Sequence, residues 1–556
     1  MIETPPRFGS KRFREILAPA FSADPVTALA GLYWMATRRR VRGWSSLMVA
    51  ASKAALNYAR WTRHGEGRAL EQYRRLHPRT ESAPLLVVLL LDKESPPGVA
   101  ELSAATIRRA LGDGVIYSAG PRTGVNRVPG SGGLSEALST LAEWHPTAWL
   151  LAISTGDQLS PALGDVLARS LGTGDEVLAY WDEDCLRAGE RRDPWVKPDW
   201  DPLLFGNVGS LVGASVTSIA VANRVAHSFP DERLDRSGIQ RLLMGVAAIE
   251  RPKHIPLILT HRHEPSAGRC VPVETPPVPS SWPSVSIIIP TRDRPELLAA
   301  CLEGIGRTDY PGALQIIVMD NGSRDPAALE LLKQVEKNPQ AKVLRDDGKF
   351  NFSRLNNRAA GAAGGEFLCL LNNDVEPLDA DWLEKLVRYA VTEGVGAVGA
   401  QLLYPSGRIQ HAGVAIGVGG AAGHVQKGVD PAEPGFWTWH AVTREVSAVT
   451  AAVMVVKKSA FDHAGGFDEA AFAVAFNDID LCLRLKQNGL RNIYVAEARL
   501  VHFESESRGD DRSPAHARRF ASELARLQER WSTQDYQDPH FSPLFSRLVE
   551  RCVLAP

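Results

Sequence analysis

Between residues 285 and 504 the chain repeatedly switches from short apolar runs to polar clusters, and this alternation limits the fold more than any other feature. The apolar runs predict strands at 285–289, 315–319 and 366–371. Helices are predicted between and after them, at 295–307, 326–337, 353–363 and 381–391. This order is typical of an α/β fold in which helices cover a largely parallel sheet. Ligands of such sheets bind beyond the carboxyl ends of the strands, which is where the polar clusters fall.

Two of these clusters follow the first two predicted strands. Pro290, Thr291 and Asp293 could line a nucleoside pocket, but taken alone they are better explained as a helix start, because Thr and Asp are good N-caps. Asp320 begins Asp-Asn-Gly-Ser, which is ordinary turn chemistry as well. Carboxylates at two neighbouring strand ends strengthen the pocket interpretation, and both alternatives stay open.

The third cluster is Asn372, Asn373 and Asp374, after a strand that is apolar on both faces. There the Asp374 carboxylate could bind Mg²⁺ or Mn²⁺, since these cations prefer oxygen ligands and often take only one or two carboxylates beside substrate phosphates. A polar turn explains the cluster equally well. His502 lies on a short apolar strand, where a histidine is more often packed than ligating, yet imidazole is a natural additional ligand for manganese.

The fourth cluster places Asp478 at or near the start of a predicted helix that runs to Asn488. The helix dipole favours the ionised carboxylate there, and an ionised carboxylate can take a proton from an attacking hydroxyl. An N-cap explains Asp478 equally well. Asp480, further into the first turn, is expected to support the helix charge or the acceptor rather than to supply the base.

Length, cysteines and hydropathy narrow the class of protein. A chain of 556 residues is too long for one core and predicts about three or four folding units. The six cysteines are scattered with no Cys-x-x-Cys spacing. No segment reaches the roughly 18 apolar residues of a spanning helix, and the N-terminus lacks a signal-peptide pattern. We therefore expect a cytoplasmic protein that is neither secreted nor membrane-spanning.

The net charge of -1 hides a basic N-terminal segment: residues 1–80 carry 15 Lys/Arg and 5 Asp/Glu. Arginines and aromatic residues mix in this segment in a way that suits an anionic bilayer surface. They include Arg38, Arg39, Arg40, Arg42, Trp34 and Trp44. Peripheral contact with the inner face of the plasma membrane is one interpretation. A solvated helical extension that packs on the next domain is at least as well supported, and no nucleic-acid partner is expected.

Residues 285–510 resemble the inverting family 2 glycosyltransferases, which have a Rossmann-like GT-A fold. Each matching motif is weak alone, but their combination is specific. The motifs are Ile-Pro-Thr from Ile289, Asp-Asn-Gly-Ser from Asp320, Phe-Asn-Phe-Ser from Phe350 with Asn356 and Asn357, Asn-Asn-Asp from Asn372, Gly-Gly-Phe-Asp-Glu from Gly465, and Asn477-Asp478 with His502. Asn372 replaces the first residue of the usual Asp-x-Asp, and Asn477 replaces the glutamate common before the catalytic aspartate.

The resemblance implies a role for each matching residue. Asp478 would be the general base, and Asp374 with His502 would hold Mn²⁺ or Mg²⁺. The donor-binding residues would be Pro290, Thr291, Asp293, Asp320, Asn356, Asn372, Asn373 and Asp374. The implied reaction is a single displacement that moves a sugar from a UDP- or dTDP-sugar to a hydroxyl of a glycan or lipid-linked acceptor, with inversion. The implied pathway is bacterial surface polysaccharide synthesis, such as O-antigen.

Residues 81–266 resemble the same family less well. The matching segments are Trp-Asp-Glu-Asp from Trp181, Lys-Pro-Asp-Trp from Lys197, His-Ile-Pro-Leu from His254, and Ser-Thr-Gly-Asp from Ser154 at the metal-motif position. The Pro-Thr turn is missing after Leu91, Tyr-Ser-Ala-Gly from Tyr117 replaces the acidic nucleoside cluster, and no Asn-Asp pair opens 238–244. We predict a degenerate transferase domain with a scaffolding or acceptor-binding role. A second active site with altered residues is the alternative.

The predicted domains are a basic helical segment at 1–80, the degenerate GT-A-like domain at 81–266, a Pro-rich linker at 267–283, the catalytic GT-A domain at 284–510 and a helical tail at 511–556. The tail is expected to pack back on the catalytic domain or to form a dimer contact. Two other functions stay open. One is a carbohydrate- or nucleotide-binding scaffold without turnover. The other is a sugar nucleotidyltransferase, which would be expected to show a Gly-rich basic loop that is not visible after Ile289.

Overall fold

The structure is a computed structural model that describes residues 5–7, 9–37, 39–53, 57–79, 84–91, 98–112, 115–119, 126–128, 133–171, 176–208, 211–263, 275–432, 439–503 and 514–555. Arg38 and residues 267–274 of the Pro-rich linker lie outside these ranges. The chain divides into two compact units. The C-terminal unit comprises Met1–Pro5, Pro272–Phe541 and Arg547–Cys552, and the N-terminal unit comprises Pro6–Val271, Ser542–Ser546 and Val553–Pro556.

The N-terminal unit begins with four helices: α1 (Lys11–Ala23), α2 (Pro25–Ala36), α3 (Arg40–Ser52) and α4 (Asn57–Leu76). Ser10 and Asp24 cap α1 and α2 by accepting hydrogen bonds from backbone N–H groups of the first turn. Trp44 and Leu47 of α3 are fully buried, and α3 packs against both α1 and α2. No helix in the described part of the chain is both long and apolar enough to cross a bilayer.

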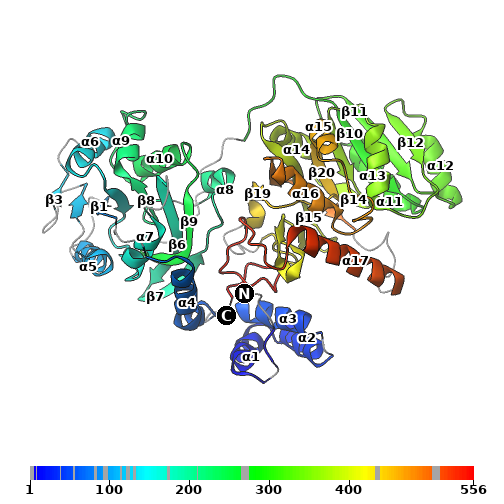
Figure 1. Ribbon diagram of the computed structural model, residues 1–556. Helices are drawn as coiled ribbons and strands as arrows, with labels where there is room; N and C mark the ends of the chain where they lie inside the picture. Colours follow the sequence, from blue (N-terminus) through cyan, green and yellow to red (C-terminus); the bar gives the residue numbers. More distant parts are fainter. Residues whose placement is uncertain are drawn as a thin grey trace. The chain divides into compact units, whose positions relative to one another are not determined.

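A mixed sheet forms the rest of the N-terminal unit (Figure 1), with strand order β3-β2-β1-β4-β8-β6-β9-β5 and β7 paired to β6. Its strands are β1 (Leu86–Leu90), β2 (Val115–Ser118), β3 (Asn126–Arg127), β4 (Trp149–Ile153), β5 (Gln158–Leu159), β6 (Leu178–Arg187), β7 (Glu190–Trp195), β8 (Ser215–Ser218) and β9 (Lys253–Arg262). Its helices are α5 (Val99–Leu111), α6 (Leu134–Trp144), α7 (Leu163–Ser170), α8 (Pro202–Asn207), α9 (Ile219–Ala226) and α10 (Arg236–Ala247).

The C-terminal unit contains a larger sheet of order β12-β11-β10-β13-β20-β15-β21-β14, with β16 paired to β15 and β19 to β21. Its strands are β10 (Val285–Thr291), β11 (Leu314–Asp320), β12 (Ala341–Arg345), β13 (Phe367–Leu371), β14 (Val375–Pro377), β15 (Val395–Leu403), β16 (Ile409–His411), β19 (Arg444–Val446), β20 (Val453–Lys457) and β21 (Arg491–His502). A separate hairpin pairs β17 (Val414–Ile416) with β18 (Ala422–His424).

Helices of the C-terminal unit alternate with its strands: α11 (Pro295–Gly306), α12 (Pro326–Val335), α13 (Phe352–Gly361), α14 (Trp382–Ala390), α15 (Lys458–His463), α16 (Asn477–Gln487) and α17 (Pro514–Trp531). The three predicted strands and four predicted helices of 285–391 are confirmed to within about two residues at each end. The fold class is confirmed as α/β. The sheet is parallel from β12 to β13 and mixed beyond it, because β20, β14 and β16 run antiparallel to their neighbours.

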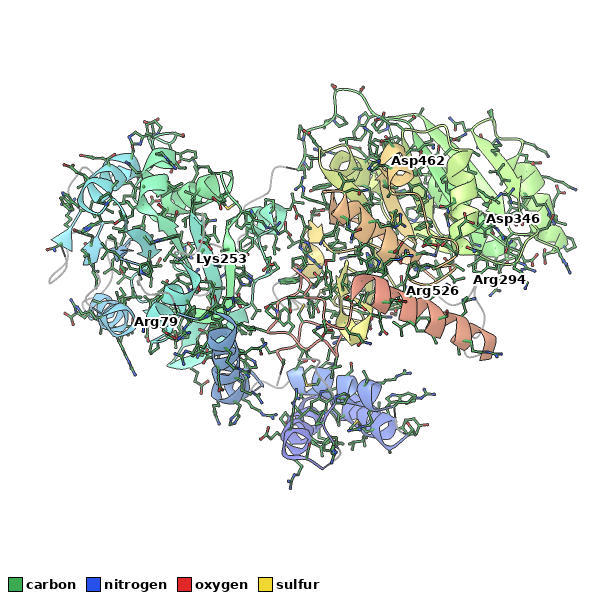
Figure 2. All side chains as sticks on the ribbon, viewed as in Figure 1. Arg79, Lys253, Arg294, Asp346, Asp462 and Arg526 are labelled. Carbon is green, nitrogen blue, oxygen red and sulfur yellow. The ribbon has the colours of Figure 1, made fainter. Side chains whose placement is uncertain are left out.

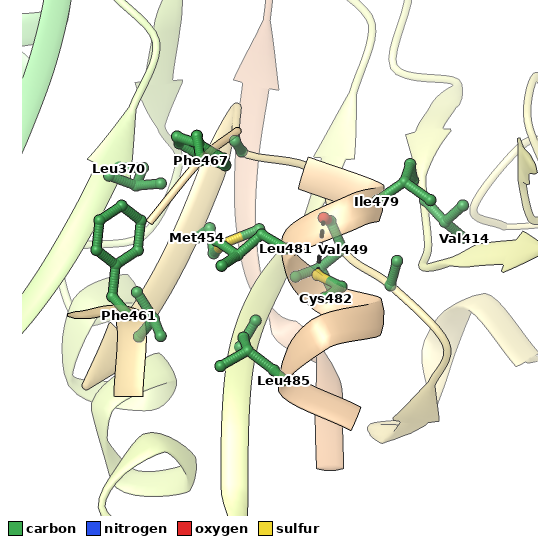
Figure 3. Packing of buried hydrophobic residues seen from close by; sticks show 14 of the residues in the cluster. Leu370, Val414, Val449, Met454, Phe461, Phe467, Ile479, Leu481, Cys482 and Leu485 are labelled. Carbon is green, nitrogen blue, oxygen red and sulfur yellow. Dashed lines mark hydrogen bonds between the residues drawn. The ribbon is translucent and has the colours of Figure 1, made fainter. Parts of the chain in front are cut away.

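The main core of the C-terminal unit lies between α16 and the sheet. Leu481, Cys482 and Leu485 of α16 are buried against Met454 of β20, and the Cys482 thiol donates to the Val449 carbonyl at 3.7 Å (Figure 3). Burial of this face fixes where α16 begins. The first residues of the helix, Asn477 and Asp478, are thereby held in place.

Helix α17 packs on the same core, as the spacing of its apolar residues predicted. Leu527 is fully buried in the cluster, and Trp531 packs against it. Glu523 accepts hydrogen bonds from Val474 N and Ala475 N, each at 3.1 Å. Arg526, labelled in Figure 2, donates to the Ala470 carbonyl at 2.6 Å. The helix therefore braces the loop that precedes α16.

Replacement of Leu527 by Ala removes a fully buried side chain from this contact. We expect the variant to lose about 2–5 kcal/mol of unfolding free energy in the C-terminal unit, seen as a lower Tm. Leu524→Ala, on the same helix but only half-buried, is the matched control and should have a smaller effect. Equal Tm values for the two variants would show that α17 is not docked through Leu527.

Candidate active site

Three parallel strands bring the first polar residues to one edge of the sheet. Thr291, at the end of β10, is the register partner of Asp320, at the end of β11. Asn373, in the loop after β13, donates from Nδ2 to the Thr291 hydroxyl at 3.1 Å. The strand ends after β10, β11 and β13 thus form one connected polar edge, the place where α/β sheets bind ligands.

The two carboxylates on this edge hold the turn that follows β11. Asp320 is fully buried; it accepts from Ser323 N at 2.9 Å and from Arg345 Nη1 at 2.9 Å. Asp293 accepts from Arg324 N at 2.7 Å and Asp325 N at 2.9 Å, and these two hydrogen bonds lower the pKa of Asp293. For Asp320, the turn interpretation left open from the sequence agrees with the bond from Ser323 N. For Asp293, the alternative was a helix start, but α11 follows Arg294 without a side-chain cap and Asp293 bonds to the turn after β11 instead.

A cavity of about 220 Å³ adjoins this edge, and the remaining candidate metal-binding and catalytic residues line it. Asn372, Asp374, Asn477, Asp478 and His502 all line it, although they come from the loop after β13, the start of α16 and the end of β21. Asn356 is not among its lining residues. That side chain is buried within α13 and donates to the Phe352 carbonyl at 2.8 Å.

Asp374 and His502 meet because β14 pairs antiparallel with β21, with Val375 opposite His502. His502 Nε2 lies 3.2 Å from Asp374 Oδ1 and 3.4 Å from Asn372 Nδ2. Its Nδ1 lies 2.7 Å from Gln410 Oε1, while Gln410 Nε2 donates to the His502 carbonyl at 3.4 Å. Gln410 therefore assigns the ring proton to Nδ1 and directs the Nε2 lone pair towards the carboxylate.

This pair fits a divalent cation by its spacing and donor chemistry. Cis ligands of an octahedral ion with bonds of about 2.1 Å lie about 3 Å apart, close to the 3.2 Å between Asp374 Oδ1 and His502 Nε2. No group of three or more His, Cys, Asp or Glu side chains that could hold a metal occurs in the described ranges. Such a cation would need further ligands from substrate phosphates or water, as is usual for Mg²⁺.

Asp478 is the second residue of α16 and is half-buried at the cavity wall. Phe476 immediately before the helix has a left-handed backbone with φ of 62°, which a side chain adopts only when its surroundings impose it. The Asp478 carboxylate accepts from Ala451 N at 3.1 Å and Ile479 N at 2.9 Å. Two backbone N–H groups and the helix N-terminus all favour its ionised form.

Asp480 has a different environment from Asp478. It is fully buried, and its carboxylate accepts from Arg484 Nε at 2.8 Å, Arg530 Nη1 at 2.9 Å and Trp531 Nε1 at 3.0 Å. These partners join the start of α16 to α17. Asp480 thus supports the helix, as predicted, and does not line the cavity.

Two cavity residues, Gln410 and Lys427, were not predicted as site residues from the sequence. Gln410 acts through its contact with His502, which depends on the pairing of β16 with β15 and leaves no motif in the sequence. His424 also lines the cavity. Its Nδ1 lies 2.8 Å from that of His411, and burial lowers the pKa of His424 to about 3, so the pair is uncharged at neutral pH.

The cavity wall formed by β17 and β18 is held from behind by residues distant in sequence. Ile416 N donates to Asp538 Oδ2 at 2.6 Å. Gly419 N donates to the Arg547 carbonyl at 2.7 Å, and Gln426 N to the Glu550 carbonyl at 2.9 Å. Arg551 Nη2 donates to the Gly428 carbonyl at 2.8 Å. We call residues 547–551 the C-terminal strap, since these bonds fix the wall that carries His424 and Lys427.

Comparison with known proteins agrees with the position of this site. Residues 286–443 match the model of glycosyl transferase family 2; Asp478 and His502 lie beyond the matched region. An uncharacterized protein, y4gI, of Sinorhizobium fredii is 36% identical over 469 residues, which cover 76% of this chain and 51% of the relative. The O-antigen biosynthesis protein RfbC of Myxococcus xanthus is 35% identical over 404 residues, covering 64% of this chain and 31% of that protein. The chain thus spans about half the length of the first relative and a third of the second.

Among solved structures, a mannosyltransferase from Pyrobaculum calidifontis in complex with GDP-Man and Mn²⁺ is 20% identical, with a TM-score of 0.36. The match covers 49% of this chain and 70% of that one. A TM-score this low does not by itself establish a common fold. The family match identifies a glycosyl transferase family 2 region at residues 286–443, within the C-terminal unit. The two relatives are similar in sequence, and one of them is named for O-antigen biosynthesis.

Proposed function

We propose that the C-terminal unit is an inverting glycosyltransferase that moves a sugar from a nucleoside-diphosphate sugar, with UDP or dTDP as the carrier, to a hydroxyl of a glycan or lipid-linked acceptor. The observation that carries the proposal is that Asp374, His502 and Asp478 line one cavity at the carboxyl ends of the strands. The family match supports sugar transfer. The relative named for O-antigen biosynthesis supports a bacterial surface polysaccharide as the product.

In this proposal Asp374 and His502 hold a divalent cation, Mn²⁺ or Mg²⁺. When bound, that ion supplies positive charge for the departing nucleoside diphosphate. Lys427, on the same cavity, adds a second positive charge. Asn372 lies 3.4 Å from His502 Nε2 and is neutral, so its amide can approach a phosphate without the repulsion that a carboxylate would cause.

The donor nucleotide is assigned to the polar edge beside the cavity. Thr291 and Asn373, already hydrogen-bonded to each other, would contact the ribose and phosphates. Pro290 and Asp293 would line the nucleoside pocket, and Asp320, fully buried with both carboxylate oxygens bonded, would support it from within the sheet edge. Their bonds within the turn after β11 hold the carboxylates before the donor arrives, which lowers the entropy cost of binding. Asn356 is not proposed as a donor contact, because its amide is buried within α13.

Asp478 is proposed as the general base. Its carboxylate is held by two backbone N–H groups on the cavity wall. An acceptor hydroxyl placed between Asp478 and the anomeric carbon loses its proton to the carboxylate as its oxygen attacks, and the nucleoside diphosphate leaves from the opposite face. One displacement of this kind inverts the anomeric configuration and forms no covalent enzyme intermediate.

The test is release of nucleoside diphosphate from a panel of UDP- and dTDP-sugars, with and without Mn²⁺, in the presence of a lipid-linked acceptor extract. Asp478→Asn should lower kcat by on the order of 10²–10⁴-fold, the usual contribution of a general base. Asp374→Ala should abolish the Mn²⁺-dependent part of the rate.

Asp462→Asn is the matched control for these substitutions. Asp462, labelled in Figure 2, is an exposed residue of α15 that pairs with Lys458 at 2.9 Å and lies outside the cavity. Its replacement should leave the rate unchanged. If the wild type binds nucleotide but never releases product from any donor, the C-terminal unit is a binding scaffold and the proposal is wrong.

Gln410 offers a separate test of the metal pair. Gln410→Leu removes the acceptor that holds the proton on His502 Nδ1, and we expect Mn²⁺ affinity to fall about 10–100-fold, as for other residues that orient metal ligands. Gln410→Glu keeps an acceptor in place and should retain most of the affinity. Isothermal titration with Mn²⁺ and UDP compares the two variants. Equal affinities would show that Gln410 does not orient His502.

We also propose that the N-terminal helices contact the cytoplasmic face of an anionic membrane. Val26, Leu29 and Tyr33 of α2 form an exposed apolar stripe, with 77%, 59% and 59% of their surfaces accessible. Beside it in the sequence, Arg39 and Arg42 stack over Trp34, 5.0 and 4.1 Å from its ring. Exposed apolar residues next to arginines are typical of helices that lie on anionic bilayers.

Co-sedimentation with vesicles tests this contact. The full chain should bind vesicles that contain phosphatidylserine and not pure phosphatidylcholine. Replacing Arg39, Arg40 and Arg42 by Gln should weaken binding on the order of 100-fold, at about 1 kcal/mol per arginine. Val26→Glu with Leu29→Glu should also abolish binding. Ile249→Glu, at a 60% exposed apolar residue of the sheet-bearing part, is the control. Binding that survives the α2 substitutions would contradict the proposal.

A further inference from the structure

The two units repeat one sheet topology. In both, the strands follow the same order along the sheet and the same order along the chain, so that β1 corresponds to β10, β4 to β13, β5 to β14 and β9 to β21. The relative directions also agree: β1 pairs parallel with β4 as β10 does with β13, and β5 pairs antiparallel with β9 as β14 does with β21. Positions in the two sheets can therefore be equated through their registers.

The equated positions include the metal pair proposed above. Gln158 of β5 lies opposite His261 of β9, as Val375 lies opposite His502. Asp157 precedes Gln158 as Asp374 precedes Val375. The N-terminal unit thus also has an aspartate and a histidine at these two places.

Asp157 nevertheless contacts the two residues that follow His261 and not His261 itself. Its Oδ1 accepts from His263 N at 2.8 Å, and its Oδ2 lies 3.9 Å from Arg262 Nη1. Asp157 is 3% exposed, and burial raises its pKa to about 6 against the lowering effects of Arg262 and His263 N. His261 Nδ1 bonds to Asp184 Oδ1 at 2.7 Å.

Arg262 occupies the space beside Asp157 and is itself 1% exposed. Its guanidinium forms a two-armed ion pair with Glu183, in which Nη2 lies 2.5 Å from Oε2, and Nη2 also donates to the Val212 carbonyl at 2.7 Å. Lys197 Nζ, also buried, bonds to Glu183 Oε2 at 3.1 Å and to the Trp181 carbonyl at 2.6 Å. Asp157 and Glu183 therefore face Arg262 and Lys197 within this group, and Asp182 and Arg236 add one further carboxylate and one further cation beside it.

A divalent cation does not fit this group, because it would add two positive charges to a buried cluster that is already neutral, at a large desolvation cost. The start of α10, which follows β8 and α9 as α16 follows β20 and α15, carries a cation too. Its first residue is Arg236, where α16 has Asn477, and Arg236 Nη1 lies 3.3 Å from Ser154 Oγ. Ser237 stands at the place of Asp478, and the nearby Asp235 carboxylate caps the helix by accepting from Gly238 N at 3.0 Å.

We infer that the N-terminal unit is a second copy of the transferase sheet in which the Arg262 guanidinium permanently takes the place of the divalent cation. The unit keeps an aspartate and a histidine at the two register positions, but the Arg262 guanidinium neutralises the carboxylates. Arg236 stands where the C-terminal unit has Asn477, next to the proposed base. This unit therefore contributes no metal-dependent transfer. Occupation of this site by Arg262 does not depend on any activity of the C-terminal unit.

The test measures Mn²⁺ binding by electron paramagnetic resonance on the full chain carrying Asp374→Ala, which removes the site proposed in the C-terminal unit. With Arg262 intact, we expect no Mn²⁺ binding, and adding Asp157→Asn should change nothing. Adding Arg262→Ala instead should remove the cation beside Asp157 and Glu183 and create a site for about one Mn²⁺ per chain at these two carboxylates. Asp157→Asn should abolish the gained site.

Two results would overturn the inference. One is Mn²⁺ binding by the Asp374→Ala chain that disappears with Asp157→Asn, since the N-terminal unit would then hold a metal beside Arg262. The other is a folded Arg262→Ala variant, judged by circular dichroism, that gains no Mn²⁺ site. If Arg262→Ala does not fold, Arg262→Gln keeps one hydrogen bond to Glu183 while removing the charge. In either case, Mn²⁺ binding by the Arg262 variant is compared with Mn²⁺ binding by the Asp374→Ala chain that retains Arg262.

Discussion

The short antiparallel pairing of β14 with β21 is the contact on which the site of the C-terminal unit depends. It joins only three residue pairs, yet it brings Asp374 next to His502, which lie far apart in the sequence. The parallel core of the sheet delivers Thr291, Asp320 and Asn373 to the same edge. Burial of α16 against β20 then sets Asp478 on the cavity wall. The chemistry thus follows from strand pairing and core packing rather than from any local motif.

The same contact recurs in the N-terminal unit with a different electrostatic outcome. Asp157 and His261 hold the same register positions, but Arg262 and Lys197 supply the compensating charge from within the chain. A buried carboxylate must have a positive partner or hydrogen-bond donors. In the C-terminal unit, Asp374 and His502 are proposed to bind a cation from solution. In the N-terminal unit, Arg262 and Lys197 supply the positive charge. Removing Arg262 would leave Glu183 buried without its main counter-charge. The acidic residues of the proposed former metal site can therefore remain although no metal binds there.

Local patterns predicted three of the five strands and all four helices of 285–391, because the predicted strands are apolar runs and the helices have apolar residues at helical spacing. They missed β12 and β14, which are short or only partly buried. They also identified Asp478, Asp374 and His502 as candidates. They could not show that these three share a cavity, since that requires the β14–β21 pairing and the docking of α16. Gln410 was missed because its role depends on a neighbour across the sheet. Asn356 was predicted as a donor contact from the family motif alone, whereas its amide bonds within its own helix.

The C-terminal strap has a consequence for how the protein is made. The wall of the cavity formed by β17 and β18 is bonded to residues 547–551, which leave the ribosome more than 120 residues later than the wall itself. Domains generally fold as units during synthesis, and the strap belongs to the C-terminal unit although it is synthesised last. The cavity wall is therefore complete only when the strap has been synthesised.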